Sequence, residues 1–331
     1  MFKTLPLLLI SISISISCMA SSSPEITKIG DVKVETETDM TRSEDTSNAD
    51  RQGSLDVNGI MAKVIDRYVG HTEVSTISLM TCPYRMKNNS LSCSSKPRKK
   101  TVKSLTKSYG DNLRDSKGLM LIVSPVAEYG IGVLQYDYTS SGKDADQWLY
   151  LPELDQVKRV ASSADAPKKG SLFGSEFALE DMEKEKIEEY HYTIIEESEF
   201  SGHDAIVIEQ KPNLERAKKS NYLKRVKWVD RENYVVLKED FYELNGELLK
   251  TSLSSDIENI EGIWTVKKQT MRNIKTSRIS LIQYTGVTYN LDIDDEYLTQ
   301  RILSDSVFRE NFLNSLGDLK VADNMQESSS R

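Results

Sequence analysis

The sequence predicts a mainly β protein in which one large antiparallel sheet curls round, with a few helices beside it. Apolar and polar residues alternate along many short runs rich in Val, Ile, Thr, Tyr and Trp. These runs follow one another at intervals of about 12 to 15 residues without helical patterns between them, which is typical of a meander. Asn245-Gly246 is a strong hairpin signal, because a tight primed turn needs positive φ at both central residues, and Gly202 and Gly262 mark two more turns. A sheet of about ten strands cannot stay flat, and its edges must be closed or covered.

The chain begins with the pattern of a secretory signal peptide, for which we predict residues 1–20. One lysine precedes an apolar run from Leu5 to Ile16, and Ala20 offers a small residue for cleavage. Attachment of a lipid at Cys18 is the alternative, although Ser15 stands where a lipoprotein signal usually has Leu. Both interpretations export the protein, and we expect it in the periplasm.

The remaining chain divides into three parts. Residues 21–57 are polar and lack periodicity, so we predict a disordered leader. Residues 58–306 form one folded domain, and residues 307–331 form a polar tail. Helical patterns are confined to Asn58–Tyr68, Ala178–Ile187 and Asp294–Leu303.

After signal cleavage the chain keeps two cysteines, Cys82 and Cys93. An even pair in an oxidising compartment predicts a disulfide, which here would join two adjacent strands of a hairpin. Two unpaired buried thiols are the alternative.

Charge and histidine placement exclude several classes of function. The formal net charge is −8 and the one basic cluster is Lys96–Lys100, so we expect no binding of nucleic acid. This cluster either solvates the foot of the hairpin or meets anionic lipid headgroups. The three histidines are scattered without ligand spacing, so we expect no metal and no cofactor.

The stretch KKGSLFGSEFALEDME, from Lys168 to Glu183, combines glycines and serines with two phenylalanines. It does not match a phosphate-binding loop, because the glycine spacing is wrong and no lysine follows the second glycine. It does not match a hydrolase nucleophile elbow either, because Phe173 and Phe177 flank Ser175 where glycines are needed. We predict no catalytic residue and no enzymatic activity. Because nothing else in a polar loop calls for aromatic rings, we expect Phe173 and Phe177 to face an apolar partner.

Four segments together resemble the outer-membrane lipoprotein-sorting (LolA-like) proteins, and in particular the branch that accompanies resistance-nodulation-division (RND, MMPL-type) exporters. These segments are WLYLP at Trp148–Pro152, KRV at Lys158–Val160, GSEFALED at Gly174–Asp181 and KRVKWVD at Lys224–Asp230. The chain departs from the family pattern in the insert with the two cysteines and at Tyr136, where a Trp is expected.

The resemblance implies an unclosed half-barrel covered by helices, with a groove on its concave side. Composition alone favours a closely packed sandwich core instead, so the groove rests on the resemblance. Tyrosines, tryptophans and aliphatic residues of the strands are candidates for lining either the groove or the core: Leu121, Val123, Trp148, Tyr150, Trp228, Tyr242 and Tyr284. Phe173 and Phe177 are candidates for a lid, which Arg159 could anchor through a backbone carbonyl or through Glu180. A surface ion pair is the alternative for Arg159.

The resemblance also implies a role as a periplasmic carrier. Such a protein would hold acyl chains of a lipid or lipoprotein and move them to or from the outer membrane, with an RND-type inner-membrane exporter and an outer-membrane acceptor as partners. A lipid-sensing or accessory subunit of an envelope complex is the alternative, and a hydrolase is a more remote one.

Overall fold

The computed structural model describes residues 56–316, except residues 88–89, 111, 141 and 161–169. The predicted signal peptide, nearly all of the predicted leader and residues 317–331 therefore lie outside the described residues. Fourteen strands make up most of the described chain: β1 Thr72–Lys87, β2 Ser90–Cys93, β3 Arg98–Tyr109, β4 Asp115–Ser124, β5 Gly132–Asp137, β6 Asp146–Leu151, β7 Gln156–Val160, β8 Tyr190–Phe200, β9 His203–Pro212, β10 Lys224–Asp230, β11 Val236–Tyr242, β12 Leu248–Ile260, β13 Ile263–Asn273 and β14 Arg278–Tyr289.

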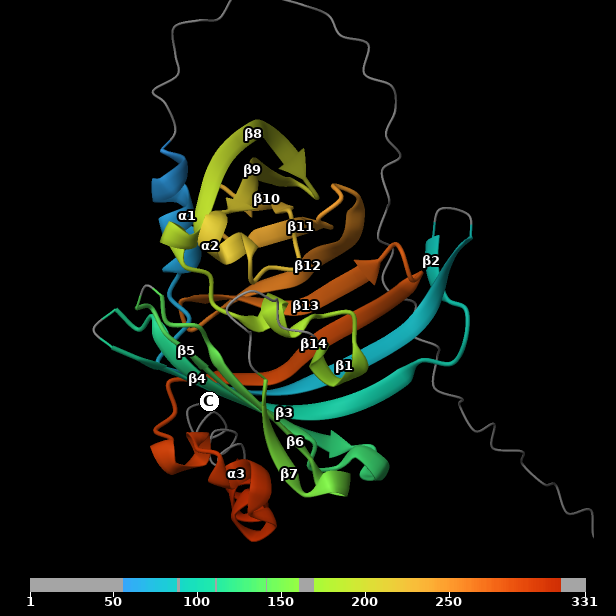
Figure 1. Cartoon of the computed structure of the whole chain (residues 1–331), viewed down its shortest axis with the longest axis vertical. Coiled ribbons are helices and arrows are strands. Elements are labelled where there is room, and N and C mark those ends of the chain that lie inside the picture. Colours follow the sequence, from blue (N-terminus) through green and yellow to red (C-terminus); the bar gives the residue numbers. More distant parts are fainter. Residues whose placement is uncertain (1–55, 88–89, 111, 141, 161–169, 317–331) are drawn as a thin grey trace, which may run out of the picture.

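The strands form one antiparallel sheet that does not close into a barrel. Its order is β7-β6-β5-β4-β3-β1-β14-β13-β12-β11-β10-β9-β8, with β2 added to the far end of β1. Neighbouring strands are mostly consecutive in the chain, and turns at Gly202, Asn245-Gly246 and Gly262 connect them at the predicted places. The primed turn predicted at Asn245-Gly246 is wrong, because Gly246 has positive φ and Asn245 does not. The sheet bends between its two edge strands, β7 and β8, which lie at opposite ends of the molecule in Figure 1. The predicted fold class, an unclosed antiparallel half-barrel, is confirmed.

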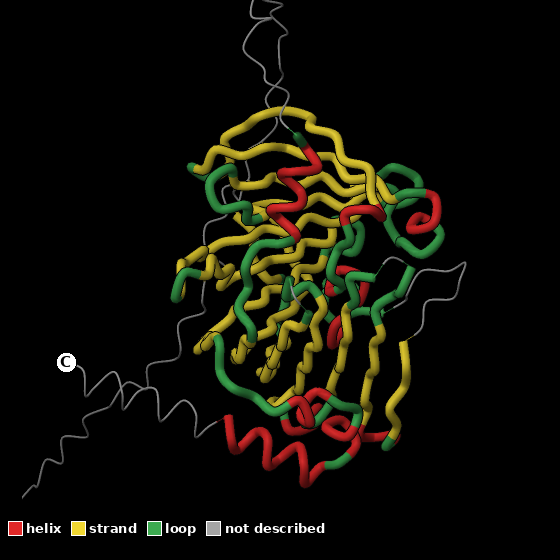
Figure 2. Tube along the Cα trace, turned by 90° about the vertical axis from the view of Figure 1, so that its left-hand side faces the viewer, coloured by secondary structure: helices red, strands yellow, loops and turns green. Residues whose placement is uncertain are grey.

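The helices lie at the margins of the sheet. They are α1 Val57–Ile65, α2 Leu214–Ala217, α3 Arg301–Ser304 and, after α3, a helix over residues 306–316. Asp56 begins α1 by accepting a hydrogen bond of 3.1 Å from the backbone of Asn58. Figure 2, viewed from the side of α1, shows this helix across the strands at one end of the molecule and the C-terminal helices at the other. In the described part of the chain, no helix has both the length and the apolar character needed to cross a bilayer.

The two faces of the sheet bury different apolar clusters. On β4, for example, Leu121 points to one face and Ile122 to the other. The outer face, with Leu121, is covered by the C-terminal helices through Ile302, Phe308 and Phe312. The predicted domain ended at residue 306, but the folded structure continues to residue 316, because apolar residues at helical spacing pack there on the sheet.

The inner face of the sheet is crossed by the connection between the two edge strands. We call residues 170–189 of this connection the strap; they contain three short 3-10 turns, Leu172–Gly174, Leu179–Met182 and Ile187–Glu189. The helix predicted over Ala178–Ile187 is therefore wrong. The acidic side chains of this segment instead reach separate cations on the sheet, and these tertiary contacts override helix propensity.

The first hairpin extends beyond the rest of the sheet. A disulfide joins Cys82 to Cys93, with the two Cα atoms 5.7 Å apart. The predicted pairing of the cysteines thus agrees with the structure, and the bond lies where β1 leaves its other neighbours and continues with β2 alone.

Candidate ligand-binding site on the inner face

A cavity of about 340 Å³ lies between the C-terminal end of α1 and the inner face of the sheet. Val64, Arg67 and Val69 border it from the helix and the loop that follows. Strands β1, β11, β12, β13 and β14 supply the opposite wall, which includes Glu73, Glu239, Ser252, Ser254, Gln269, Tyr284 and Tyr289. Its volume falls within the range of about 300 to 1,000 Å³ that is usual for small-molecule sites.

The walls of the cavity mix apolar and polar groups. Burial raises the pKa of Glu73, which also accepts a hydrogen bond of 3.3 Å from Ser75, and burial lowers the pKa of Arg67. The phenol of Tyr284 has a raised pKa for the same reason. Arg67 is held by the backbone carbonyl of Trp264. Burial therefore disfavours charge on these groups, and the polar atoms of the cavity could orient an amphiphile whose apolar part is buried.

Beside this cavity, the strap buries its aromatic residues in the sheet. Leu172, Phe173 and Phe177 pack in one cluster with residues of the inner face, and Tyr284 joins the edge of the same cluster. Phe173 has a φ of 50°, in the left-handed region, which is rare for a bulky residue. Its carbonyl accepts a hydrogen bond of 2.7 Å from the ammonium group of Lys100. The strap thus fills the apolar part of the inner face that adjoins the cavity.

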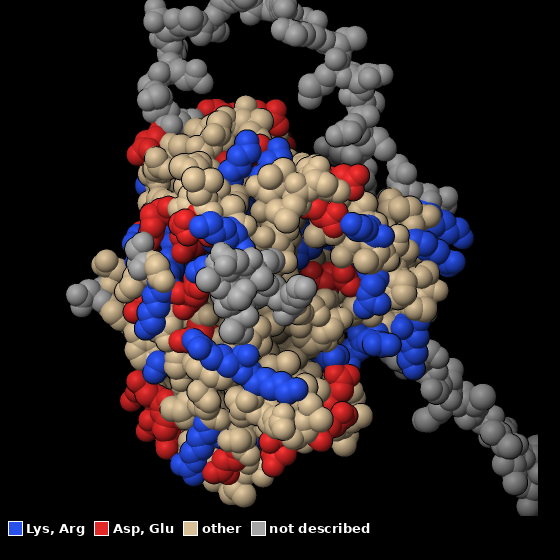
Figure 3. Space-filling view, in the orientation of Figure 1, with Lys and Arg blue, Asp and Glu red and all other residues tan. Residues whose placement is uncertain are grey.

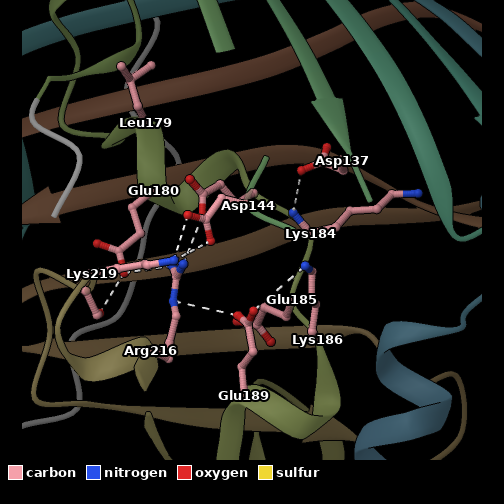
Figure 4. A network of polar contacts seen from close by, with 12 residues as sticks. Asp137, Asp144, Leu179, Glu180, Lys184, Glu185, Lys186, Glu189, Arg216 and Lys219 are labelled. Atoms are coloured by element: carbon pink, nitrogen blue, oxygen red, sulfur yellow. Dashed lines mark hydrogen bonds and ion pairs between the residues drawn. The ribbon is translucent and has the colours of Figure 1, made fainter. Parts of the chain in front are cut away.

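Acidic residues of the strap hold it to the sheet through buried ion pairs. Asp181 lies 2.5 Å from the ammonium group of Lys250, and both side chains are almost fully buried. Glu180 pairs with Arg216 at 3.1 Å and accepts a hydrogen bond of 2.6 Å from Ser220. In Figure 4 the guanidinium of Arg216 lies between Glu180 and Glu189.

Burial opposes the negative charge of Glu180, but its pKa is lowered because Arg225 and Arg216 stabilise the carboxylate. From the other half of the sheet, Gln135 and Gln147 donate hydrogen bonds to the backbone carbonyls of Met182 and Leu179, at 2.7 and 3.1 Å. Both halves of the bent sheet therefore hold the strap.

Two glutamates lie beside the cations Lys227 and Arg225, at different distances and with opposite shifts of pKa. Glu185, in the strap, lies 2.6 Å from Lys227 through each of its carboxylate oxygens and 3.0 Å from Arg225. Burial opposes this charge, but the two cations prevail and lower the pKa of Glu185 to about 2. Glu239, which also faces the cavity, lies 3.5 Å from each cation, and burial raises its pKa. Glu185 of the strap therefore pairs with Lys227 and Arg225 more closely than Glu239 of strand β11 does.

Comparison with known proteins connects this architecture to a family. A family model described as "uncharacterized protein" matches residues 114–305, which is more than half of the chain. The chain belongs to that family. No curated protein matches it.

Among solved structures, a putative outer membrane lipoprotein-sorting protein domain from Vibrio parahaemolyticus is similar, with 26% identity and a TM-score of 0.64 over 75% of this chain and 97% of that one. A DUF1329 family protein from Desulfovibrio piger has 22% identity and a TM-score of 0.65, over 74% of this chain and 97% of that one. A LolA superfamily protein from Nitrosomonas europaea has 20% identity and a TM-score of 0.54, over 74% and 98%. The predicted resemblance to outer-membrane lipoprotein-sorting (LolA-like) proteins is confirmed by this likeness of fold, whereas the branch that accompanies RND-type exporters stays a prediction.

The residues predicted to line a groove or core are spread over both faces. Tyr284 borders the cavity, and Phe173 and Phe177 lie in the strap cluster beside it. Leu121, Trp148 and Tyr150 instead pack under the C-terminal helices on the outer face. The other three are partly exposed: Val123, Trp228 and Tyr242. Trp228 stacks beneath Lys238, and Tyr242 beneath Lys224. A role of any of these nine residues in binding lipid stays a prediction.

The predicted contact between Arg159 and Glu180 is wrong. Arg159 pairs with Asp146 inside the β6–β7 hairpin and is largely exposed. Glu180 is buried and does hold the strap, but with Arg216 as its partner. A surface ion pair, the alternative expected for Arg159, is the correct description.

Sequence reasoning missed the cations and the polar residues of the inner face. The cations that hold the strap include Arg216, Arg225, Lys227, Lys250, Arg278 and Lys100. The segment KRVKWVD, Lys224–Asp230, contains a signal for two of them, because Arg225 and Lys227 stand at alternate positions of a strand and must share a face. Within the described residues, no group of three or more His, Cys, Asp or Glu side chains is arranged to hold a metal ion.

Proposed function

We propose that this protein binds acyl chains of a lipid or lipoprotein on the inner face of its half-barrel and carries them through the bacterial envelope, to or from the outer membrane. The observation that carries the proposal is the cavity between α1 and the inner face, bordered by Tyr284 and continuous in the fold with the apolar cluster under the strap. The similarity to an outer membrane lipoprotein-sorting domain at 26% identity supports it.

The size of the cavity suggests how a long chain would be accommodated. A volume of about 340 Å³ lies at the small end of ligand sites. Phe173 and Phe177 occupy the adjoining apolar surface, so a longer acyl chain would take their place while the strap moves aside. Each buried methylene contributes about 0.8 kcal/mol, and the rings of the strap compete for the same surface. Such competition would let a carrier release its cargo rather than trap it.

A substitution that fills the cavity tests the site. Ser254 borders the cavity, whereas Ser255, the next residue of β12, is exposed on the other face. We expect wild-type protein to bind a fluorescent fatty acid and to yield acyl species on lipid extraction and native mass spectrometry. Ser254→Trp should weaken fatty-acid binding at least about tenfold, which corresponds to about 1.4 kcal/mol, and Ser255→Trp should leave it unchanged.

Two results would contradict the proposal. Wild-type protein that binds no fatty acid would exclude an acyl site, and equal losses in both Trp variants would place the site elsewhere. A protein that binds acyl chains but never transfers them between vesicles would instead be a lipid-sensing or accessory subunit. Turnover of an ester substrate would favour a hydrolase.

The RND-type exporter is proposed as the partner on the sequence motifs alone. Co-purification of the two proteins from the native membrane tests that partnership. Lipid transfer that proceeds at the same rate without the exporter would argue against it.

A further inference from the structure

The first hairpin carries a concentration of positive charge that is unusual for this chain. Between residues 74 and 110 the sequence has eight Lys or Arg residues and no Asp or Glu, although the whole chain has a net charge of −8. In Figure 3, Lys and Arg side chains gather on the flank where Figure 1 places β2 and the adjoining end of β3.

This part of the chain projects from the sheet. The pairing of β1 with β14 ends at Pro83, opposite Arg278, and its pairing with β3 ends at Thr81. From Tyr84 to Lys87, β1 pairs with β2 alone among the described strands. The disulfide between Cys82 and Cys93 ties the base of this extension.

Five cations at the end of β1 and between β2 and the start of β3 are exposed, and none of them has an ion pair with another described residue. They are Arg85, Lys87, Lys96, Arg98 and Lys99, and we call them the basic hairpin surface. Two acids beside this part of the chain already have partners: Glu128 pairs with Lys100, and Glu176 pairs with Arg278, which lies opposite Pro83. The five charges are therefore available to an external anionic partner.

We propose that the basic hairpin surface docks this protein on a membrane that is rich in anionic lipid headgroups. Each Lys or Arg held near such a bilayer strengthens binding about fivefold, and five act together here. Met86 is 47% exposed, but it points to the face of β1 opposite to Arg85 and Lys87, so the docking rests on the cations. An acidic protein as a whole is repelled by an anionic bilayer, so attraction has to come from a local surface of this kind.

The strap lies next to this surface. Lys100 donates to the carbonyl of Phe173, and Arg278, opposite the foot of the extension, pairs with Glu176 of the strap at 2.7 Å. Docking through the hairpin would therefore place the strap, and the inner face beneath it, close to the bilayer. The inference itself does not depend on the proposed carrier function.

Vesicle co-sedimentation tests the docking surface. We expect full-length wild-type protein to bind vesicles that contain about one third phosphatidylglycerol, not to bind pure phosphatidylcholine vesicles, and to dissociate at high salt. A variant with all five cations replaced by Gln (R85Q, K87Q, K96Q, R98Q, K99Q) should bind at least about a hundredfold more weakly.

A matched control loses the same charge elsewhere. Five cations that pair with nearby acids and lie outside the hairpin are replaced in this control, four of them exposed and Lys267 half-buried: Lys211, Lys218, Arg231, Lys267 and Arg301, each to Gln. This variant should bind anionic vesicles within about threefold of the wild-type protein, because its charge lies off the docking surface. Circular dichroism confirms that both variants are folded.

Three outcomes would overturn the proposal: no binding of wild-type protein to anionic vesicles at low salt, an equal loss in the control variant, or binding of the hairpin to an acidic protein with none to vesicles. Fatty-acid binding, measured on the same variants, separates this inference from the proposed function. Vesicle binding without fatty-acid binding would refute the acyl site alone, and the reverse would refute the docking surface alone.

Discussion

Replacing Glu185 with Gln should destabilise the protein by about 3 kcal/mol at pH 7, whereas the same change at Glu239 should alter stability by less than about 1 kcal/mol. Lys227 and Arg225 lower the pKa of Glu185 from 4.5 to about 2. Each pKa unit corresponds to about 1.4 kcal/mol, and removing one partner of a buried ion pair typically costs about 3 to 5 kcal/mol. Glu239 lies 3.5 Å from the same cations and has a raised pKa, so the removal of its charge relieves a cost of burial.

The contributions of the two glutamates to folding stability change with pH in opposite directions. The folded-state pKa of Glu185 is lowered, so its contribution is fully present above about pH 5 and is lost as the pH falls towards 2. The folded-state pKa of Glu239 is raised, so its contribution is present at low pH and is lost as the pH rises through that pKa. The stability gap between wild-type protein and Glu185→Gln should therefore narrow as the solution is acidified.

Urea unfolding, followed by far-ultraviolet circular dichroism and tryptophan fluorescence at pH 7, 5 and 3, measures these differences. Glu239→Gln serves as the matched control, because it makes the same chemical change beside the same two cations. Equal destabilisation by both variants at pH 7 would refute the reasoning, and so would a gap for Glu185→Gln that stays constant down to pH 3.

Three further predictions concern packing and the disulfide. Phe177→Ala should destabilise the protein by about 3 to 5 kcal/mol in chemical denaturation, because its ring is buried in the strap cluster, whereas Ile195→Ala, at an exposed position, should change stability by less than about 0.5 kcal/mol. A small effect of Phe177→Ala would mean that the strap opens independently of the fold. Phe312→Ala should cost a similar amount in thermal unfolding, since the helix over residues 306–316 covers the outer face, and an unchanged melting temperature would show that this helix is dispensable. Cys82→Ser should cost up to about 3 kcal/mol for a loop of this length, and a wild-type protein whose stability is unaffected by reducing agent would argue against the bond.

The fold was largely predictable because its signals are local. Alternation along the strands and the turns at Gly202, Asn245-Gly246 and Gly262 need only neighbouring residues to be read. The helix over residues 306–316 was not predicted, although Phe308, Phe312 and Leu316 stand at helical spacing, because this short stretch runs into the polar end of the chain.

The candidate site was much less predictable. Tyr284 borders the cavity, whereas Trp148 and Tyr150, equally aromatic and equally plausible in a strand, lie on the outer face. A strand displays its residues alternately on two faces, so a register shift of one residue exchanges the inner and outer sets. No pattern in the sequence indicated which face of the sheet α1 and the strap would cover.

By itself, the sequence determined the antiparallel sheet, the positions of its turns and the family resemblance, and it favoured the pairing of Cys82 with Cys93 that the structure contains. Only the tertiary structure decided that residues 170–189 span the two edge strands and lock onto the inner face through ion pairs. Glu180 and Arg216 are 36 residues apart in the chain, and Asp181 and Lys250 are 69 apart. Such pairs form only when the bent sheet brings distant strands together, and local sequence carries no information about which distant charge each acid will meet.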